Sequence, residues 1–471
     1  MLLTLLYGLA PVAIAHLPIV DPDIWWHLRE GQWIVEHGAV PYTDPFSAYG
    51  VGKRWFAYSW LFEVLVYGLF RVWGFVGLAL YTVALSLAVT VALHRLVRTL
   101  HPSFPLSCIL TALGILGMMP VLLHPRPWLL NIVLFIIVVT VLFSVRQSGN
   151  DRPLLLLPPL FVLWANINIQ FVYGLFVIGL AASEPVIERL LRRPERAESF
   201  RFGRMTLTLL ACIVATLMTP YHLLIYLPVF DAIRLTDPFL YLKELQPLAF
   251  RASFDWIVLA LTLSAAFALG WRKESAPFPL LLLASGALFA FRARRDVWFV
   301  LVAAVAVLAL SARRHAKPEE FVFTRPRVLA LALALAGVLL VVSSWTLSNR
   351  RLEDALSKTF PVAAAAFVEE RGYRGSLYNH YDWGGYLIWR LPDLAVSMDG
   401  RNPLHGDARI LRSIATWDGK RGWASDPELV AAELVIASVD HALVSLLRLD
   451  TRFQLVYEDA VAAVFVARRE N

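Results

Sequence analysis

The sequence predicts a polytopic α-helical membrane protein of about eleven transmembrane helices, with a soluble α/β domain at its C-terminal end. Three observations predict this class. First, 58% of the 471 residues are hydrophobic and only 17% are charged, whereas about a quarter of the residues in soluble proteins are charged. Second, apolar segments long enough to cross a bilayer recur as far as residue 347. Third, the residues after 350 change to short apolar runs separated by Gly, Pro and Asp.

The apolar segments give the expected transmembrane helices. A helix needs about 20 apolar residues to cross the hydrocarbon, and somewhat fewer where neighbours shield its ends. The first segment has no basic stretch before it and no small-residue cleavage site after it, so we expect it to be retained. The expected spans lie near residues 3–20, 75–97, 106–123, 127–146, 153–166, 170–190, 204–222, 254–271, 276–291, 296–312 and 327–347.

Residues 57–71, AYSWLFEVLVYGLFR, form an apolar segment that we expect to lie along the membrane surface. The segment is short and aromatic, and Glu63 lies in its middle. If it does not cross, alternate loops carry most of the arginines and face the cytoplasm by the positive-inside rule. Those loops hold Arg95 and Arg98, Arg146 and Arg152, the run 189–204, Arg272 and Lys273, and the run 313–327. We therefore expect a cytoplasmic N-terminus and an extracytoplasmic C-terminal part.

The C-terminal part is expected to form a small domain of its own. Helix-like PVAAAAFVEERG and HALVSLLRLD alternate with strand-like SLYN, LAVSMDG, ELVIAS and FQLVYEDAVAAVFVAR, which favours an α/β arrangement. About 120 residues are enough to bury a core. The expected domains are a transmembrane domain at 1–349, whose outer loop 21–74 carries the chemistry, and an extracytoplasmic α/β domain at 350–471.

Charge and cysteine usage exclude several classes of protein. The net charge of +7 is modest, and no basic stretch accompanies a nucleic-acid module, so nucleic acid is not an expected partner. Cys108 and Cys212 both lie inside hydrophobic segments. The sequence therefore predicts neither a disulfide framework nor a cysteine-based zinc site.

The outer loop opens with DPDIWWHLRE, directly after the first apolar segment. One interpretation is structural: Asp21 caps a helix that starts at Pro22, Asp23 lies in its first turn, and the tryptophans lie at the lipid interface. The other is functional, because a carboxylate at the membrane surface can act as a general base or ligate a metal. Asp23 and His27 would share a helix face. Asp44, in PYTDPFS, adds a third acid or forms an Asp-Pro turn.

Three arginines, Arg292, Arg294 and Arg295, lie in the FRARRD turn on the expected outer face, against the positive-inside bias. A guanidinium binds phosphate in a fork and can stabilise it as a leaving group. Arg126 in HPRP lies on the same expected face. The alternative is an ion pair with Asp296 plus contacts to lipid head groups. Glu244 is a further outer-face acid, which loop solvation explains equally well.

These short motifs, in this order, resemble those of the GT-C class of membrane glycosyltransferases. The class includes protein mannosyltransferases, aminoarabinose transferases and oligosaccharyltransferases, and it uses polyprenyl-phosphate- or polyprenyl-diphosphate-linked sugars. The resemblance covers the whole membrane part and implies a GT-C-like fold. Some members also hold a divalent metal, Mg²⁺ or Mn²⁺, at the acidic motif. The matching residues are Asp21-Pro22-Asp23, Trp25-Trp26-His27, Pro41 with Asp44 to Ser47, Arg126-Pro127, and Trp164 with Asn166.

The chain departs from the class in one loop and matches it weakly in another. Relatives often carry His-Gly after the Asn of the Trp164–Asn166 motif, whereas this chain has Ile167-Asn168-Ile169-Gln170. Asn168 or Gln170 would then replace the histidine. In the C-terminal part, Tyr381-Asp382-Trp383-Gly384 is loosely similar to the acceptor-contacting WWDYG motif of oligosaccharyltransferases. The alternative for this stretch is a strand–turn element.

The resemblance implies an inverting glycosyltransferase on the outer face of a bacterial cytoplasmic membrane. It would move a sugar from a polyprenyl-phosphate donor to a hydroxyl on a glycan, lipid or protein. The candidate catalytic residues are Asp23, Asp21 and His27, and the candidate donor-phosphate ligands are Arg126, Arg292, Arg294 and Arg295. The candidate substrate-binding residues are Trp26, Asp44, Asn166, Asn168, Gln170, Glu244, Asp382 and Trp383.

Two other classes of function stay open. A transporter or flippase of lipid-linked sugars would use the same acids and arginines for binding alone, although the spans hold almost no ionisable residues and no internal repeat is evident. A non-catalytic membrane partner of a polysaccharide assembly machine would use the outer domain for recruitment.

Overall fold

The computed structural model describes residues 2–15, 21–50, 52–191, 200–234, 242, 244–271, 276–312, 329–331, 333–335, 337 and 348–468. The chain forms two compact units. Unit 1 comprises Met1–Leu17, Ala79–Val229 and Pro238–Thr346, and unit 2 comprises Pro18–Leu78, Phe230–Asp237 and Leu347–Asn471. Unit 2 therefore joins the predicted outer loop to the C-terminal residues.

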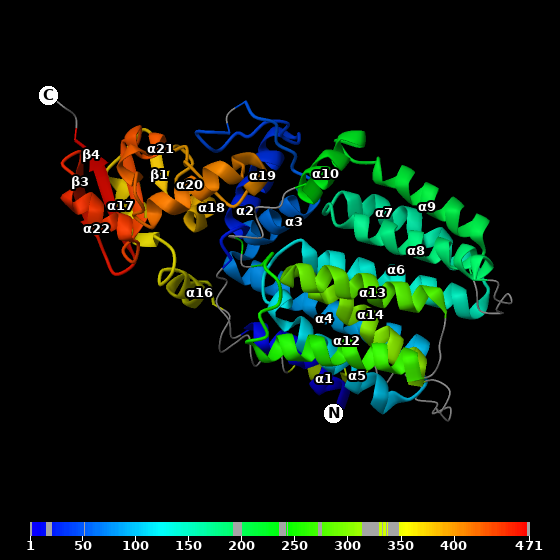
Figure 1. Cartoon of the computed structure of the whole chain (residues 1–471). Helices are drawn as coiled ribbons and strands as arrows, with labels where there is room; N and C mark the ends of the chain where they lie inside the picture. The colour runs from blue at the N-terminus through cyan, green and yellow to red at the C-terminus, as the bar shows by residue number, and fades with distance from the viewer. Residues whose placement is uncertain are drawn as a thin grey trace. The chain divides into compact units, whose positions relative to one another are not determined.

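Unit 1 is built from helices (Figure 1). Six are long and apolar enough to cross a membrane: α4 (Phe75–Leu100), α5 (Phe104–Leu122), α6 (Trp128–Ser148), α8 (Phe171–Leu190), α12 (Ser253–Trp271) and the stretch Arg294–Ala312, which contains η3 (Arg294–Asp296) and α14 (Val297–Ala312). The others are α1 (Leu2–Ala15), η1 (Arg152–Leu156), α7 (Leu157–Ala165), α9 (Phe202–Thr216), η2 (His222–Ile225) and α13 (Pro277–Arg292). The helix α10 (Tyr226–Arg234) begins in unit 1 and ends in unit 2.

Three predicted spans, 153–166, 204–222 and 276–291, correspond to shorter apolar helices. Prolines account for two of the differences: Pro153 lies in a 3-10 turn ahead of α7, and Pro220 follows the end of α9. The predicted span at 327–347 lies largely outside the described residues. Arg272, Lys273, the basic run 313–327 and half of the run 189–204 also lie outside the described residues.

The centre of unit 1 is α14, which is apolar all round and almost wholly buried. It packs against α5, α12 and α13 (Figure 1). Glycine permits the closest approach, because a Cβ on Gly286 of α13 would lie 2.9 Å from the Cα of Val300 on α14. This packing positions η3, which carries the predicted phosphate-binding arginines, at the start of α14.

Unit 2 combines helices with one small sheet. Its helices are α2 (Ile24–His37), α3 (Trp60–Trp73), α16 (Asn349–Leu356), α17 (Val362–Glu370), α18 (Tyr381–Arg390), α19 (Asn402–His405), α20 (Asp407–Trp417), η5 (Trp423–Ser425), α21 (Pro427–Val430) and α22 (Ala442–Leu449). At 14 residues, α3 is shorter than the roughly 20 that a membrane crossing needs.

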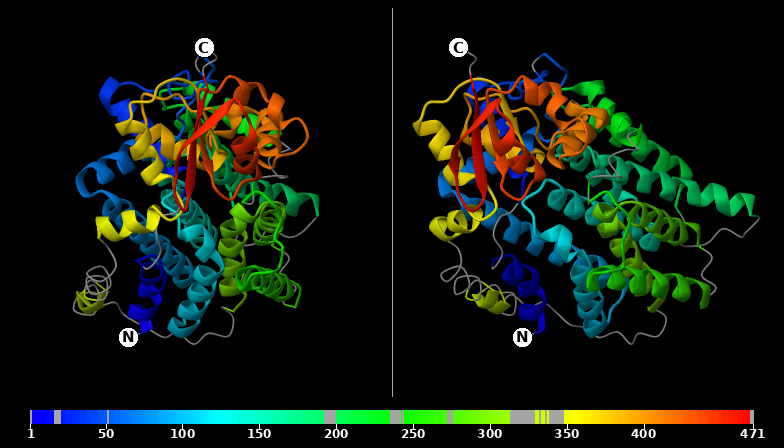
Figure 2. Two further views of the ribbon diagram at one scale, coloured as in Figure 1. Left: turned by 90° about the vertical axis from the view of Figure 1, so that its left-hand side faces the viewer. Right: turned by 60° about the vertical axis from the view of Figure 1, so that its left-hand side comes forward.

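The sheet contains β1 (Leu377–Asn379), β2 (Leu434–Ser438), β3 (Phe453–Glu458) and β4 (Ala462–Ala467) in the order β1-β2-β4-β3. The β1–β2 pair is parallel and the other pairs are antiparallel. Figure 2 shows β3 and β4 as the hairpin near the C-terminus. The apolar side of the sheet covers a core that includes Tyr378, Trp417, Val435, Leu443 and Phe465. The runs SLYN, ELVIAS and FQLVYEDAVAAVFVAR thus form strands.

Two segments differ from their predicted conformation. LAVSMDG forms only isolated bridges, from Val396 to Ser47 and to Leu377. The stretch after β1, for which a strand–turn element was the alternative, is instead the helix α18. Its two glycines fit the helix because each is pressed against backbone: a Cβ on Gly384 would lie 1.8 Å from the Met398 oxygen, and one on Gly385 would lie 2.6 Å from the Pro22 oxygen. Gly385 thereby holds α18 against the start of α2.

Candidate functional site

The acidic motif lies immediately before α2, and its two carboxylates have different surroundings. Oδ1 of Asp21, which is buried, accepts a hydrogen bond from the backbone N–H of Asp23 at 2.9 Å. The helix begins at Ile24 with Asp23 as its N-cap. The prediction that Asp21 caps a helix starting at Pro22 is therefore wrong, because an Asx turn precedes the helix. The Asp23 side chain makes no capping hydrogen bond and is partly exposed.

The carboxylate of Asp23 lies against the C-terminal residues of unit 2. A Cβ on Gly400 would lie 1.9 Å from Oδ1 of Asp23 and 3.4 Å from Nε1 of Trp26. Tyr381 is a further neighbour, and its hydroxyl donates to Oδ1 of Asn402 at 2.7 Å. Burial raises the pKa of Tyr381 well above its usual value, and the charge of Asp23 adds to this effect. Asp23, Trp26 and Tyr381 thus surround the backbone of Gly400.

The hydrogen bond between the His27 side chain and Glu63 directs the imidazole ring away from Gly400. It is 3% exposed, and its Nδ1 lies 3.0 Å from Oε1 of Glu63 on α3. Its ring packs on Trp26, with centroids 3.5 Å apart, and edge-to-face on Phe62. The predicted helical spacing from Asp23 is present, since the His27 N–H donates to the Asp23 carbonyl at 3.3 Å. The imidazole nevertheless faces the contact between α2 and α3.

A buried ion network lies beside the acidic motif, and sequence reasoning identified only one of its members, Asp44. Arg401 donates to Asp44 at 2.5 Å and to both oxygens of Asp399 at 2.9 and 2.8 Å. Nε2 of His405 lies 3.3 Å from Asp399. Burial alone would raise the pKa of Asp399, but Arg401 and His405 hold it well below its usual value. Asp44 also accepts from the N–H groups of Phe46 and Ser47 at 3.1 Å, which forms the DPFS turn.

The predicted acceptor motif contributes mainly to packing. The Asp382 side chain is 63% exposed and lies 4.0 Å from Nδ1 of His380. Trp383 is 6% exposed, and its indole N–H donates to the Thr359 carbonyl at 3.0 Å. Because Gly384 and Gly385 have no side chains, the backbone of Met398 lies close to Gly384 and that of Pro22 lies close to Gly385. The glycines of this motif therefore position α18, while Asp382 alone presents a carboxylate to solvent.

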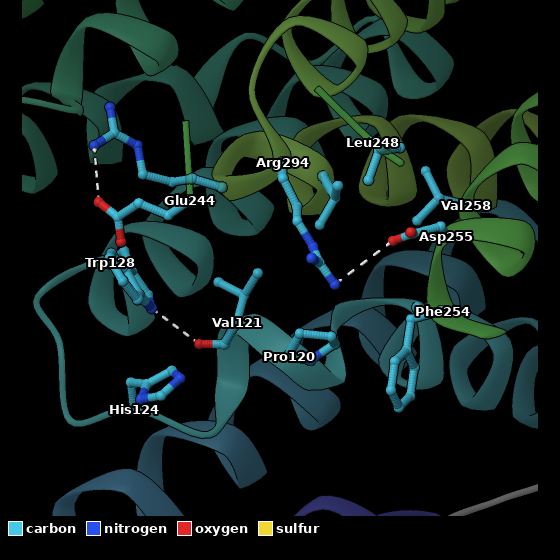
Figure 3. Close-up of a pocket in the computed structure, with 13 residues that line it drawn as sticks. Pro120, Val121, His124, Trp128, Glu244, Leu248, Phe254, Asp255, Val258 and Arg294 are labelled. Carbon is cyan, nitrogen blue, oxygen red and sulfur yellow. Dashed lines mark hydrogen bonds and ion pairs between the residues drawn. The ribbon is translucent and has the colours of Figure 1, made fainter. Parts of the chain in front are cut away.

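Unit 1 contains a cavity of about 190 Å³ at the turn that carries the predicted arginines (Figure 3). Nη2 of Arg294 lies 3.8 Å from Asp255, and Nη1 of Arg295 lies 3.7 Å from Glu244. The backbone N–H groups of both arginines donate at 2.9 Å, to the carbonyls of Gln246 and Glu244. The lining residues are Gly117, Pro120, Val121, His124, Trp128, Glu244, Leu248, Phe254, Asp255, Val258, Arg294, Arg295 and Val297. Apolar walls thus surround two guanidinium groups, one imidazole and two carboxylates.

The other predicted phosphate ligands lie outside the lining of this cavity. The Arg126 guanidinium stacks on the ring of Trp128, 5.0 Å from its centroid, and Trp128 is a lining residue. Arg292 is exposed at the end of α13. Asp296, the predicted ion-pair partner, lies 4.0 Å from Arg295 and accepts from the Tyr173 hydroxyl at 2.8 Å. Of the four arginines, Arg294 and Arg295 line the cavity.

The Trp164 and Asn166 motif forms a hydrogen-bonded joint between helix ends. Trp164 Nε1 donates to Asn131 at 2.7 Å, and Asn131 donates to Gln170 at 2.7 Å. Asn166 donates to the carbonyls of Val162 and Met218 at 2.8 and 2.9 Å, and Asn168 accepts from the Gln170 N–H at 3.0 Å. Sequence reasoning missed Asn131, which shares the RPWLLN stretch with Arg126. The side-chain contacts of this motif fix the ends of α6, α7 and α8.

A metal site was an open alternative for the acidic motif. Among the residues that the structure describes, no three His, Cys, Asp or Glu side chains are grouped so that they could hold a metal ion. Oδ1 of Asp21 is also used by the Asp23 N–H. The described side chains around Asp21 and Asp23 therefore do not fit a metal.

Comparison with known proteins gives structural relatives only. No family model and no curated protein sequence matches the chain. The archaeal oligosaccharyltransferase AglB from Archaeoglobus fulgidus, in complex with an inhibitory peptide and a dolichol-phosphate, matches with a TM-score of 0.56 and 11% identity over 93% of this chain and 69% of that chain. The same protein in complex with Zn and sulfate matches with a TM-score of 0.51 and 10% identity over 93% and 68%.

A bacterial protein matches over nearly its full length. ArnT from Cupriavidus metallidurans, bound to undecaprenyl phosphate, has a TM-score of 0.51 and 12% identity over 98% of this chain and 97% of that chain. Both relatives are GT-C glycosyltransferases, so the likeness predicted from the motifs is confirmed at the level of the fold. The chain is a multi-pass membrane protein with the fold of the GT-C class of membrane glycosyltransferases.

Proposed function

We propose that this protein is a glycosyltransferase that moves a sugar from a polyprenyl-phosphate-linked donor to a hydroxyl group of an acceptor. The observation that carries the proposal is the placement of Asp23. Its carboxylate makes no helix-capping bond, is partly exposed and lies against Gly400, which has no side chain to cover it. A carboxylate held in this way at a helix start is suited to remove a proton from a hydroxyl.

Trp26 supports the same assignment. Its Nε1 is buried, donates to no partner among the described residues and lies close to the space above Gly400. A buried N–H without an acceptor costs about 1–3 kcal/mol, so an oxygen atom of a substrate at this position would stabilise it. The hydroxyl of Tyr381 would be a further polar group beside the acceptor. These residues would orient the acceptor, and Asp21 would hold Asp23 through its hydrogen bond to the Asp23 N–H.

The reaction is a single displacement. Asp23 takes the proton of the acceptor hydroxyl while the hydroxyl oxygen bonds to the anomeric carbon of the sugar. The bond from that carbon to the phosphate oxygen breaks, and polyprenyl phosphate leaves with the electron pair. One displacement inverts the configuration at the anomeric carbon. This mechanism includes no metal ion, because the described side chains do not fit one.

The cavity of unit 1 supports a role for arginine on the donor phosphate. Arg294 lies 3.8 Å from Asp255 and Arg295 lies 3.7 Å from Glu244, and both distances are longer than the roughly 2.7–2.9 Å of a good charged hydrogen bond. A phosphate can replace these weak partners with shorter, forked bonds. The dolichol-phosphate on AglB and the undecaprenyl phosphate on ArnT are ligands of this chemical kind. Arg126 and Arg292 are further cations that would favour the same ligand.

The location belongs to the same proposal. We place the protein in a bacterial cytoplasmic membrane, with about eleven crossings and the acidic loop on the outer face. In this arrangement the N-terminus is cytoplasmic, and residues 350–471 form an extracytoplasmic α/β domain. The exposed apolar residues of α3, Leu65, Val72 and Trp73, support a helix that lies along the lipid surface.

Sugar transfer by the purified full-length protein tests the proposal. Labelled polyprenyl-phosphate sugars would be offered to wild type, Asp23→Asn, Asp21→Asn and the matched control Asp393→Asn, which changes an acid that is 70% exposed. We expect transfer by wild type and the control, and a loss of about 100-fold or more in Asp23→Asn. Full turnover in a folded Asp23→Asn protein would refute the role of Asp23. Saturable donor binding without any turnover would instead indicate a transporter.

A further inference from the structure

A pair of glutamates, Glu30 on α2 and Glu63 on α3, lies in unit 2 outside the proposed chemistry. Both residues are buried, at 0% and 1% exposed, and each carboxyl group influences the pKa of the other. The two helices are in close contact here, since a Cβ on Gly31 would lie 2.2 Å from the backbone oxygen of Glu63. The glutamates therefore meet inside a tight helix–helix contact with no access to water.

Each glutamate has one oxygen with a partner and one without a donor. Trp55 Nε1 donates to Oε1 of Glu30 at 2.5 Å, and Nδ1 of His27 lies 3.0 Å from Oε1 of Glu63. Among the described residues, none donates to Oε2 of either glutamate. Two buried carboxylates with bare oxygens repel each other strongly, and a proton on one of them converts the repulsion into a hydrogen bond. A neutral carboxyl group in the pair would remove this repulsion.

The groups facing the pair that can carry a positive charge are Arg401 beside Glu30 and His27 beside Glu63. Arg401 faces Glu30, but it is already bonded to Asp44 and to Asp399, which His405 also contacts. Burial raises the pKa of Glu30 to about 7, although Arg401 and Trp55 oppose this rise. Burial also raises the pKa of Glu63 well above its usual value, and the charge of Glu30 adds to it. Burial thus favours the neutral form of a carboxyl group in this pair.

We propose that Glu30 and Glu63 share a proton that joins α2 to α3, and that this link is lost and unit 2 loosens as the pH rises above neutral. A carboxyl that is protonated only in the folded state stabilises the protein fully below its unfolded value near 4.5, and this stabilisation is lost as the pH rises. Since α2 begins beside Asp23, the same loss would limit sugar transfer at alkaline pH. That last consequence rests on the proposed function.

Thermal unfolding of the purified full-length protein between about pH 5 and pH 9 tests the shared proton without any assay of transfer. We expect the ratio of folded to unfolded wild-type protein to decrease by up to about tenfold per pH unit for each proton held only by the folded state. Glu63→Gln keeps an N–H donor for Glu30 and should show a flatter dependence. Glu36→Gln makes the same change on the exposed face of α2 and should keep the wild-type slope. Equal slopes in wild type and Glu63→Gln would overturn the proposal.

Infrared spectroscopy provides a second readout, which reports on the carboxyl group itself rather than on the stability of the protein. Wild-type protein at neutral pH should show the carbonyl band of a protonated carboxyl group, which weakens at alkaline pH and is reduced in Glu63→Gln but not in Glu36→Gln. A band unchanged in folded Glu63→Gln would refute the assignment. A protein without transfer activity that still shows both signatures would refute only the proposed function, whereas an active protein without them would refute only the shared proton.

Discussion

Oδ1 of Asp23 lies 1.9 Å from the position that a Cβ on Gly400 would occupy. No side chain larger than hydrogen fits at Gly400 while the carboxylate keeps its place. Because the contact involves the end of a short side chain, Asp23 can turn away at little cost in stability. We therefore expect Gly400→Ala to displace the carboxylate and to reduce the rate of sugar transfer about 100-fold, as small misplacements of catalytic groups do.

The test compares kcat, KM and the unfolding temperature of wild type, Gly400→Ala and Gly68→Ala. Gly68 lies on α3, and a Cβ added there would have no atom within 4 Å, so its substitution should leave kcat and KM unchanged and should not lower the unfolding temperature, because alanine favours the helix more than glycine does. A decrease in kcat with an unchanged unfolding temperature identifies Gly400 as a positioning residue. Equal kcat in all three proteins would contradict this assignment.

Arg401 is expected to be essential for the stability of unit 2. Its guanidinium is fully buried between Asp44 and Asp399. Removing one member of a buried ion pair leaves the others charged and unpaired, which costs about 3–5 kcal/mol. Arg401→Gln should lower the free energy of unfolding by that amount in denaturant titration. Arg374→Gln, which removes an arginine that is 65% exposed, should change it by less than about 1 kcal/mol.

The cavity of unit 1 is expected to bind the phosphate of a polyprenyl phosphate. Arg294→Gln or Arg295→Gln would remove one charged hydrogen bond of about 1.5–3 kcal/mol and weaken binding roughly 10- to 100-fold. The opposite change is expected of Glu244→Gln, because its carboxylate competes for Arg295. Titration with undecaprenyl phosphate measures these affinities, with the uncharged alcohol as a control ligand. Arg350→Gln, at an exposed position on α16, serves as the control variant. Identical affinity in all variants would place the phosphate elsewhere.

His380 is expected to make unit 2 sensitive to acid. Its Nδ1 accepts the N–H of Asp382 at 3.3 Å and caps α18, which requires a neutral ring. Burial and the neighbouring His441 lower the pKa of His380 to about 3, whereas an exposed histidine has a value of 6.5. The unfolded chain therefore binds the proton first, and stability is lost as the pH decreases from about 6.5 towards 3.

Replacing His380 with asparagine distinguishes the effect of histidine titration from the effect of the helix cap. His380→Asn keeps an N-cap side chain that does not titrate, so its unfolding temperature should decrease less between pH 7 and about pH 4 than that of wild type. His37→Asn, on the exposed end of α2, should behave like wild type. If His380→Asn and wild type lose stability in parallel, the imidazole is not responsible.

Features encoded in adjacent residues could be predicted, and features formed by distant residues could not. The long apolar helices follow from segment length, and Arg294 and Arg295 share a cavity because they are neighbours in one turn. By contrast, Arg401 and Asp44 lie 357 residues apart, and neither position has a local pattern that indicates a buried ion pair. Glu30 and Glu63 are likewise separated by a loop, so their contact depends on how α2 and α3 pack.

Local ambiguity explains the remaining errors. The sequence Asp21-Pro22-Asp23 offers two helix starts, and the Asx turn at Asp21 selects the later one. The adjacent glycines at 384 and 385 weaken the helical signal of α18, yet their missing side chains allow Met398 and Pro22 to approach. For α18 the deciding contacts come from distant parts of the chain, which no inspection of the local residues reveals.

Most of unit 2 comes from residues 18–78 and 347–471, which are far apart in the sequence, and this separation has a consequence for biosynthesis. The ribosome makes the acidic loop early, but Gly400, Arg401 and α18 exist only after residues 79–346 have been translated. At about 5–20 residues per second, this delay is on the order of tens of seconds. Throughout that time Asp44 has no arginine partner and α2 has no α18 to pack on. The nascent loop must therefore be kept from aggregation or proteolysis until translation is almost complete, and any truncation before residue 400 leaves it without the backbone that positions Asp23.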